Sequence, residues 1–399
     1  MSGHDTESLE SDEPPAEGSA PRRWRKRHTL FAVLCVLALM ALIASYISIP
    51  YYAITPGSAQ PVQHLIGVPK KLDHHHKGDV LLVDVQLTPL RAIEWPYFWL
   101  DSNAEIVPQA SLLGPENAQQ YNTEGVLDMK DAQQAATVVA LHTLGYKVSV
   151  HPDGALLYAL LPGSPAANSL AVGDVVNAVN GHPVATAADL GARLRLLKPG
   201  DTAKMELLAY PSHKHELIRV RLSAWRIKGK GRNATLVCPP YGTDLRYPIG
   251  HVSPETLKRV SAAPCIGALN VETSYRVGKL PFRINLASEG IIGPSAGLAF
   301  TLGLIQQLDP HDLTGGLKVA ATGTMSIDGT IGDVGGVAQK TVAVRSSGAK
   351  IFFVPPQEYK VAVQHGGGGL KIFAVSKISQ AISILQHYGG KLPPAATKP

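Results

Sequence analysis

The chain has 399 residues, 45% of them hydrophobic, and a net charge of +6. This length allows two or three domains, and the hydrophobic share is ordinary for a globular protein. Apart from one N-terminal cluster the basic residues are scattered, with no long basic stripe or interleaved aromatics, which excludes a nucleic-acid footprint. The cysteines Cys35, Cys238 and Cys265 lack zinc-ligand spacing, and we expect neither a metal nor a cofactor.

The N-terminal region combines a polar tail, a basic cluster and a long uncharged run. Residues 1–20 are rich in Ser, Glu, Asp, Pro and Gly and are predicted to be disordered. The cluster Arg22–Arg27 precedes residues 29–49, which carry no charge and are long enough to cross a bilayer as a helix. A cleaved signal peptide is the alternative, disfavoured by the length of the run and the lack of a clear cleavage site. The basic cluster predicts a cytoplasmic N-terminus, with the rest of the chain outside.

The segment from residue 50 to residue 146 is predicted to contain a strand and a helix. Apolar and β-branched residues cluster from Asp79 to Leu87, as in a strand. Apolar residues recur at helical spacing from Asp128 to Leu144, and Gly145 fits a helix C-cap. The run His74–His76 is interpreted as an exposed polar turn rather than a metal site, because no partner ligands are visible nearby.

Residues 147–224 carry a β-rich pattern with three short motifs. A predicted strand over Leu156–Leu161 precedes P-G-S-P-A-A and then G-D-V-V-N-A-V-N-G, and a helix from about Ala187 to Leu197 ends at K-P-G-D. With these spacings the region resembles a PDZ domain of the bacterial protease type. Such domains bind an extended peptide as an added strand. The resemblance implies a groove near Ala155–Leu160 and Leu190–Leu194; a small domain that only positions its neighbour is the alternative.

The stretch G-I-I-G-P-S-A-G-L-A-F from Gly290 places one hydroxyl, Ser295, among small residues. Pro294 suits the first position of a helix, and the apolar residues that follow predict a mostly buried helix. Ser295 is therefore expected at a helix N-terminus, where backbone N–H groups and the helix dipole favour developing negative charge. A structural N-cap is the alternative role for this serine.

A second motif follows downstream, where Thr322-Gly323, Gly329 and Gly335-Gly336 lead to Lys340. Together with the G-P-S-A-G turn, this arrangement resembles the proteolytic domain of Lon-type serine peptidases over roughly residues 245–390. The resemblance implies an α/β fold, a catalytic Ser295–Lys340 dyad and a supporting Thr322 that orients the lysine. From the residues alone, Asp333 is the one visible carboxylate near Lys340, and its position is left open.

The order of anchor, PDZ-like region and Lon-like region resembles the bacterial PDZ-containing Lon-like proteases. We expect a disordered cytoplasmic tail (1–28), a transmembrane helix (29–49), a connecting region (50–146), a PDZ domain (147–224), a Lon-type proteolytic domain (225–390) and a disordered tail (391–399). No G-x-x-x-x-G-K-[ST] phosphate loop occurs, so ATP binding is not expected.

These features predict a membrane-anchored, ATP-independent serine endopeptidase that cleaves extracytoplasmic or membrane-associated proteins, with substrate recruited by the PDZ domain. The expected partners are protein or peptide substrates and the membrane, and not nucleic acid or ATP; homo-oligomerisation is left open. The alternative is a non-catalytic PDZ scaffold that binds protein termini at the membrane. The joint presence of Ser295 and Lys340 argues against it.

Cys238 and Cys265 are expected outside the cytoplasm, where disulfides persist, and form a candidate bridge near the entrance of the catalytic domain. Two buried, unlinked thiols are the alternative.

Overall fold

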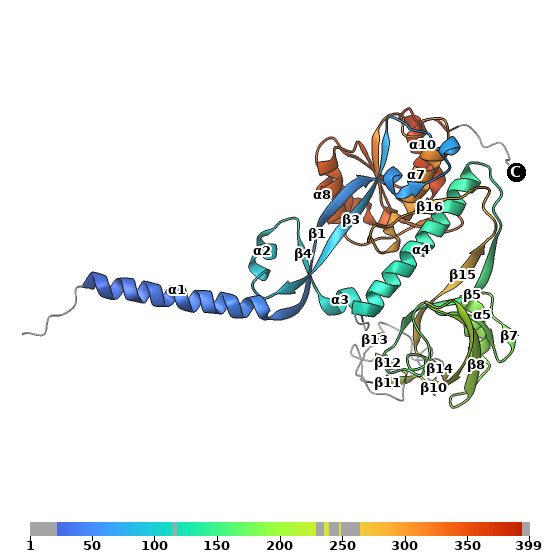
Figure 1. Cartoon of the computed structure of the whole chain (residues 1–399), viewed down its shortest axis with the longest axis horizontal. Helices are drawn as coiled ribbons and strands as arrows, with labels where there is room; N and C mark the ends of the chain where they lie inside the picture. The colour runs from blue at the N-terminus through green and yellow to red at the C-terminus, as the bar shows by residue number, and fades with distance from the viewer. Residues whose placement is uncertain (1–21, 115–117, 229–234, 239–246, 249–263, 393–399) are drawn as a thin grey trace, which may run out of the picture.

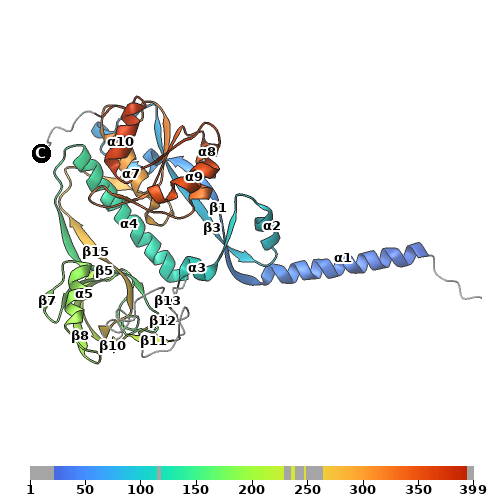
Figure 2. The same ribbon diagram turned by 180° about the vertical axis from the view of Figure 1, so that it is seen from behind.

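The structure is a computed structural model that describes residues 22–114, 118–228, 235–238, 247–248 and 264–392. Residues 1–21 and 393–399 lie outside these residues, and with them most of the two tails predicted to be disordered (1–28 and 391–399). Residues 22–28 of the first tail are instead helical, because α1 begins at Arg22, before the uncharged run. Figure 1 and, from behind, Figure 2 show a long N-terminal helix that stands away from the rest, an α/β unit, and a smaller β-rich unit joined to it.

A six-stranded mixed sheet forms the centre of the α/β unit. In spatial order its strands are β21 (Lys371–Ala374), β20 (Ile351–Val354), β17 (Lys318–Ala321), β3 (Asp79–Arg91), β1 (Ser48–Pro61) and β4 (Glu105–Pro108). The pairs β21–β20, β20–β17 and β17–β3 are parallel, whereas β1 pairs antiparallel with β3 and β4. The strand predicted from Asp79 is confirmed as β3. Strands β1, β3 and β4 precede the PDZ-like region in the chain, so the α/β unit is built from both sides of that region.

Helices cover both faces of this sheet. They are α4 (Ala118–Thr143), α7 (Gly297–Leu308), α8 (Val337–Ser347), α9 (Tyr359–Gly366) and α10 (Ile378–His387). Successive side chains of a strand point to opposite faces, so Leu82 and Phe353 pack with α4, α7 and α10, while Leu81 and Phe352 pack with α8 and α9. Every residue of α7 is buried, which confirms the predicted buried helix after Ser295.

Helix α4 is longer than the sequence pattern indicates, because it begins at Ala118 rather than near Asp128. In this first part only Gly125 and Leu127 are buried, so the apolar repeat that marks the rest of the helix is missing there. The additional turns lie beside the α/β unit and reach the turn that carries Ser295 (Figure 1).

The β-rich unit is a second antiparallel sheet with its own core. Its strands, in spatial order, are β15 (Ala268–Val277), β5 (Val150–Leu160), β6 (Val175–Val179), β8 (Thr202–Ala209) and β9 (Lys214–Arg221), with β7 (His182–Pro183) beside β6. Helix α5 (Ala187–Arg195) packs on the sheet, and Thr186 caps it together with Asp189. The predicted strand near Leu156 and the helix from Ala187 are confirmed.

Strand β15 occupies the edge of this sheet next to α5. It pairs with β5 from Val150 to Leu160, and β6 pairs with β5 at Ala155 and Leu156. A peptide cannot add there to β5, so the groove expected along Ala155–Leu160 is not formed as predicted. The backbone N–H of Ala187 donates to Thr273 Oγ1 of β15 at 3.2 Å. The strand that borders α5 is therefore supplied by the segment that leads to Ser295.

A disulfide joins Cys238 and Cys265, with their Cα atoms 6.0 Å apart, as predicted. Cys265 belongs to β14 (Pro264–Cys265), which pairs with β10 (Ser223–Ala224). The bridge packs against Leu161 at the end of β5 and against Trp225, rather than at the entrance of the catalytic cleft as expected.

Short elements complete the described fold. They are β2 (Ile66–Gly67) paired with β16 (Asn285–Leu286), β11 (Arg226–Lys228), β12 (Thr235–Val237) and β13 (Tyr247–Pro248) in one small sheet, β18 (Thr324–Met325) paired with β19 (Ile331–Gly332), and the 3-10 turns η1 (Val62–Leu65), η2 (Lys70–Leu72), η4 (Pro294–Ala296) and η5 (Pro356–Glu358).

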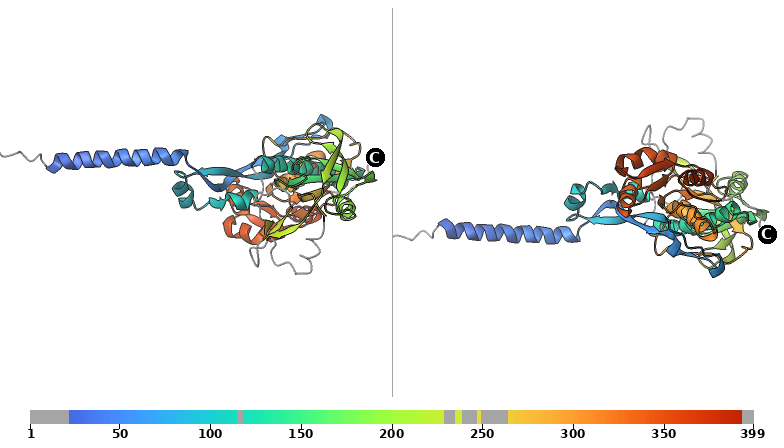
Figure 3. Two further views of the ribbon diagram at one scale, coloured as in Figure 1. Left: turned by 90° about the horizontal axis from the view of Figure 1, so that it is seen from below. Right: turned by 90° about the horizontal axis from the view of Figure 1, so that it is seen from above.

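The N-terminal helix α1 (Arg22–Tyr46) contains a stretch, His28–Tyr46, with a mean hydropathy of 2.4 and none of it buried. Its length and composition suffice to cross a membrane, although a signal sequence has the same properties. Two short helices, α2 (Trp95–Leu100) and α3 (Gln109–Leu113), lie on either side of β4. Figure 3 shows α2 beside the end of α1.

Candidate active site

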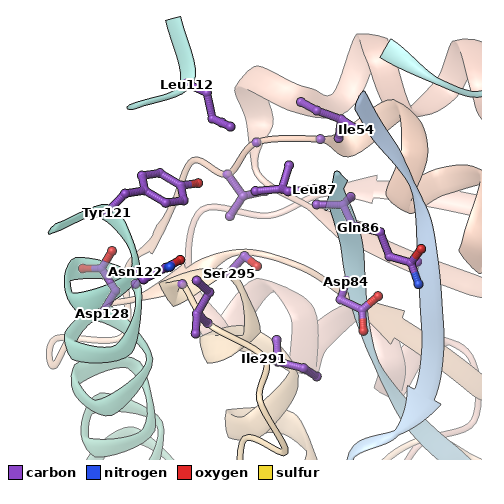
Figure 4. A pocket seen from close by; sticks show the side chains of 18 of the residues that line it. Ile54, Asp84, Gln86, Leu87, Leu112, Tyr121, Asn122, Asp128, Ile291 and Ser295 are labelled. Atoms are coloured by element: carbon purple, nitrogen blue, oxygen red, sulfur yellow. The ribbon is translucent and has the colours of Figure 1, made fainter. Parts of the chain in front are cut away.

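Ser295 lies in η4, the helical turn that leads into α7. Pro294 is the first residue of the turn, and Gly293 before it has a φ of 90°, a conformation that favours glycine. Neither η4 nor α7 has a side-chain cap, so the alternative role of Ser295 as an N-cap is wrong. Its side chain instead lines a cleft, as Figure 4 shows.

Helix α4 holds this turn from one side. The N–H of Gly293 donates to the carbonyl of Gly125 at 2.7 Å. A Cβ atom at Gly125 would lie 3.0 Å from the side chain of Ile292, closer than an ordinary van der Waals contact, so a larger residue would push on the turn that carries Ser295. From the other side, the N–H of Gly323 donates to the Ser295 carbonyl at 3.0 Å. The serine backbone is thus fixed by elements from distant parts of the chain.

Lys340 enters the same cleft from the first turns of α8 and is 3% exposed. Its Nζ donates to Thr322 Oγ1 at 3.2 Å. The Thr322 hydroxyl, fully buried, donates in turn to the carbonyl oxygen of Ser295 at 3.4 Å. The three residues named from the sequence are therefore neighbours. Within the described structure no hydrogen bond joins Ser295 Oγ to Lys340.

Burial lowers the pKa of Lys340 to about 8, because a charged ammonium is poorly solvated there. The charges of Asp84 and Glu358 oppose this effect. Asp333, the carboxylate named from the sequence, also lines the cleft but is exposed and is not among the groups that shift Lys340. Asp84 was missed, although a charge inside the apolar run Leu81–Leu87 is a signal that points to it.

The Asp84 carboxylate is held from β1. It accepts hydrogen bonds from the backbone N–H and the hydroxyl of Ser58, at 2.6 and 2.8 Å. A Cβ atom at Gly57 would collide with the same carboxylate at 1.8 Å, so the β1 backbone approaches Asp84 because residue 57 is glycine. Asp84 is thereby kept on the cleft side of β3 (Figure 4).

The cleft has a volume of about 990 Å³ and is rich in carboxylates. Five acidic residues line it, together with Lys340: Asp84, Glu124, Asp128, Glu289 and Asp333. Strand β3 forms part of one wall, with Gln86 and Leu87 among the lining residues. Strand β17 pairs with β3 only as far as Leu82, so among the described strands the following part of β3 has β1 as its one partner.

A cluster of acidic side chains, with Asp128 half-buried, connects α4 with the PDZ-like sheet next to the cleft. Burial raises the pKa of Asp128 to about 7, and the charges of Glu124, Glu272 and Asp131 add to this effect. Burial also raises the pKa of Asp131 and of Glu272. The Tyr158 hydroxyl on β5 donates to Asp131, which ties the two units together.

In the part of the chain that the structure describes, no three His, Cys, Asp or Glu side chains are grouped to hold a metal ion. Within the histidine run, His76 Nε2 lies 3.0 Å from the carbonyl oxygen of Asp309.

Comparisons with known proteins define the class of the two units. Residues 143–221 match the PDZ domain family, and residues 288–385 match the Lon protease (S16) C-terminal proteolytic domain. The chain thus carries a PDZ domain and an α/β Lon-type proteolytic domain, which is a domain of serine-type peptidases. It is 34% identical over 110 residues to Lon protease 2 of Bacillus subtilis (strain 168), covering 27% of this chain and 18% of that protein. The chain therefore spans less than a fifth of this curated relative.

Solved structures similar to the chain include PDZ domains of SdrC-like proteins. One from Listeria monocytogenes is 25% identical, covers 18% of this chain and 74% of that chain, and has a TM-score of 0.17. One from Listeria innocua is 25% identical, covers 18% of this chain and 79% of that chain, and also has a TM-score of 0.17.

Proposed function

We propose that this protein is a membrane-anchored, ATP-independent serine endopeptidase in which Ser295 is the nucleophile and Lys340 is the general base. The observation that carries the proposal is a lysine, 3% exposed and with a pKa lowered to about 8, that lines the same cleft as the serine. A serine hydroxyl is a weak nucleophile and needs a base, and a lysine can act as one only as the neutral amine.

The proposed reaction begins when neutral Lys340 takes the hydroxyl proton of Ser295, whose oxygen attacks the peptide carbonyl. The N–H of Ser295, which stands at the start of the η4 turn, has no partner earlier in that turn and can hold the oxyanion. Protonated Lys340 then gives its proton to the leaving amine. Water finally hydrolyses the acyl-enzyme. Thr322 orients the lysine through its hydroxyl.

We propose that the substrate lies in the cleft as an extended segment beside β3. Strand β17 pairs with one edge of β3, but only as far as Leu82. Beyond Leu82 that edge is available for an added strand, and Ser295 lines the same cleft. The five lining carboxylates favour a segment with basic side chains. PDZ recruitment would place another part of the substrate between β15 and α5.

The remaining parts of the proposal concern the anchor and the domain limits. We propose that α1 spans the membrane with the basic cluster in the cytoplasm and the cleft outside, in agreement with the positive-inside rule. A PDZ domain over 147–224 and a proteolytic domain over 225–390 remain our division of the chain, with β1, β3 and β4 completing the second domain and β15 completing the PDZ sheet.

The test compares the purified full-length chain with three variants on an unfolded protein substrate. Ser295→Ala and Lys340→Arg should each abolish cleavage, since arginine stays protonated, whereas Lys350→Arg, at an exposed position, should cleave normally. ATP with Mg²⁺ should not stimulate the wild type. Cleavage by a folded Lys340→Arg variant would overturn the lysine assignment. A folded wild type that binds peptides but cleaves none would instead support the scaffold alternative.

A further inference from the structure

Helix α2 carries a cluster of exposed large side chains, here called the aromatic patch, formed by Tyr97, Trp99 and Leu100. These residues are 70%, 72% and 75% exposed. Ile93, just before the helix, is also exposed. Single exposed apolar residues are common on soluble proteins, but a contiguous apolar group of this kind usually marks an interaction site.

Hydrogen bonds fix the segment leading into α2 at the end of α1. The N–H of Ala92 donates to the carbonyl of Ile47 at 2.9 Å, and the N–H of Ile93 donates to the carbonyl of Ala44 at 3.3 Å. The stretch of α1 that is apolar enough to cross a membrane ends at Tyr46. Helix α2, which carries the aromatic patch, therefore lies beside the end of the apolar stretch, as the ribbon views in Figure 3 show. This is the level at which α1 would leave a membrane that it crosses.

The composition of α2 matches the same level. Its six residues, W-P-Y-F-W-L, include no charge, whereas Arg91 and Glu94 precede it and Asp101 follows it. Tryptophan and tyrosine are enriched where hydrocarbon meets headgroups, because their rings are apolar and their N–H or O–H groups are polar. Trp95, at the start of the helix, packs edge-on against Tyr51 of β1 with ring centroids 4.8 Å apart, so the helix is attached to the sheet.

We propose that the aromatic patch inserts into the headgroup region of the bilayer that α1 crosses, and so forms a second membrane contact of the catalytic unit. This inference rests on the proposed anchoring by α1. The molecules that cover the patch are lipids, because the hydrogen bonds described above hold α2 beside the end of the apolar stretch of α1.

The second contact restrains the catalytic cleft close to the membrane. Strand β4 pairs with β1 from Tyr51 to Ile54, and α3 follows β4 directly. Tyr52 of β1 and Leu112 of α3 line the cleft that contains Ser295. A single flexible anchor would let the cleft turn in all directions, whereas an anchor with two contacts holds it near chain segments that emerge from the bilayer.

The experiment uses the full-length chain in phosphatidylcholine vesicles with a fluorescent label on one cysteine. Trp99→Cys and Leu196→Cys are each made in a Cys35→Ser background, since Cys238 and Cys265 are bonded to each other. Leu196 is a matched control, because it is 76% exposed but lies on the PDZ domain. The label at native Cys35, within the apolar stretch of α1, reports whether α1 itself is embedded. Lipids with a doxyl quencher near the headgroup are then added for positions 99 and 196, and lipids with the quencher deep in the acyl chain are added for Cys35, which lies near the middle of the apolar stretch.

A label at position 99 should be quenched about threefold more than one at position 196, because contact quenching requires the label to enter the lipid. Equal quenching at 99 and 196, with Cys35 strongly quenched, would overturn the inference and leave the anchor intact. Equal quenching at these two positions is the result expected if a second copy of the chain or a protein partner, rather than lipid, covers the patch. No quenching at Cys35 or at 99 would overturn the anchoring and the inference together.

Discussion

Lys340 Nζ and Thr322 Oγ1 are 3.2 Å apart in an almost fully buried environment, and the same threonine hydroxyl lies 3.4 Å from the carbonyl oxygen of Ser295. Thr322 is thus the group through which α8 and the serine turn are linked. A buried amine with one fixed acceptor has few orientations available to it, which is what a base that must meet a particular hydroxyl needs.

The first prediction concerns this threonine. Thr322→Val keeps the volume of the side chain but removes the acceptor, so Lys340 loses its orientation and kcat should fall by about 10- to 100-fold with little change in KM. Thr322→Ser should restore most of the activity. Steady-state kinetics on a peptide substrate measure both parameters. A Thr322→Val variant with normal kcat, or a loss confined to KM, would contradict the orienting role.

The second prediction is the pH dependence of cleavage. The base must be neutral, so kcat/KM should rise with pH and level off above about 8, the pKa of Lys340. The negative charge of Asp84 raises that pKa, and Asp84→Asn should therefore move the rise to lower pH, by about half to one pH unit.

The control for this profile is Glu289→Gln, because Glu289 lines the cleft but is not among the groups that shift Lys340. Every variant, and the reference protein, also carries Asp128→Asn. The titration of Asp128 near pH 7 then does not overlap the rise of kcat/KM that Lys340 causes. A shift to higher pH in Asp84→Asn, or an equal shift in Glu289→Gln, would contradict the assigned electrostatics.

Features that depend on adjacent residues could be predicted from the sequence, whereas those that depend on which strands lie side by side could not. The turn at Ser295, the buried α7 and the lysine were predicted because short motifs and apolar periodicity report on adjacent residues. Asp84 and β15 were not, because their roles depend on which strands lie side by side. Asp84 meets Lys340 only once β3 joins the sheet, and β15 becomes the edge of the PDZ sheet although it follows that region in the chain. The first turns of α4 were missed because their mostly exposed residues show no apolar repeat.

The third prediction concerns stability and pH at the junction of the two domains. The pKa of Asp128 is about 7 in the folded protein against an ordinary value of 3.8, so the folded state binds more protons between these values. Stability should therefore fall as the pH rises from about 4 to about 7. At 1.36 kcal/mol per pKa unit, the change is about 2–4 kcal/mol after allowance for partial exposure.

Urea unfolding of the detergent-solubilised chain at pH 5 and pH 8 measures this difference. Asp128→Asn should reduce it, with the remainder due to Asp131 and Glu272, while Glu289→Gln, at an exposed site, should leave it as in the wild type. Greater stability at pH 8 than at pH 5 in the wild type, with the difference unchanged in Asp128→Asn, would show that the pKa of Asp128 is not raised in the folded protein.

The last prediction concerns the disulfide between Cys238 and Cys265, which are 27 residues apart in the chain. Closing a loop of that length stabilises the folded state by roughly 3–4 kcal/mol in the chain-entropy model. The double variant Cys238→Ala, Cys265→Ala should lose about this amount and should no longer respond to reductant, whereas Cys35→Ser should behave as the wild type. Because the bridge packs against Leu161 at the end of β5, away from Ser295, cleavage at low temperature should persist in the double variant. Alkylation without reduction, followed by mass spectrometry, should modify Cys35 and neither of the other two. Modification of all three cysteines, or equal urea midpoints for the wild type and the double variant, would mean that the bridge does not form or does not stabilise this protein.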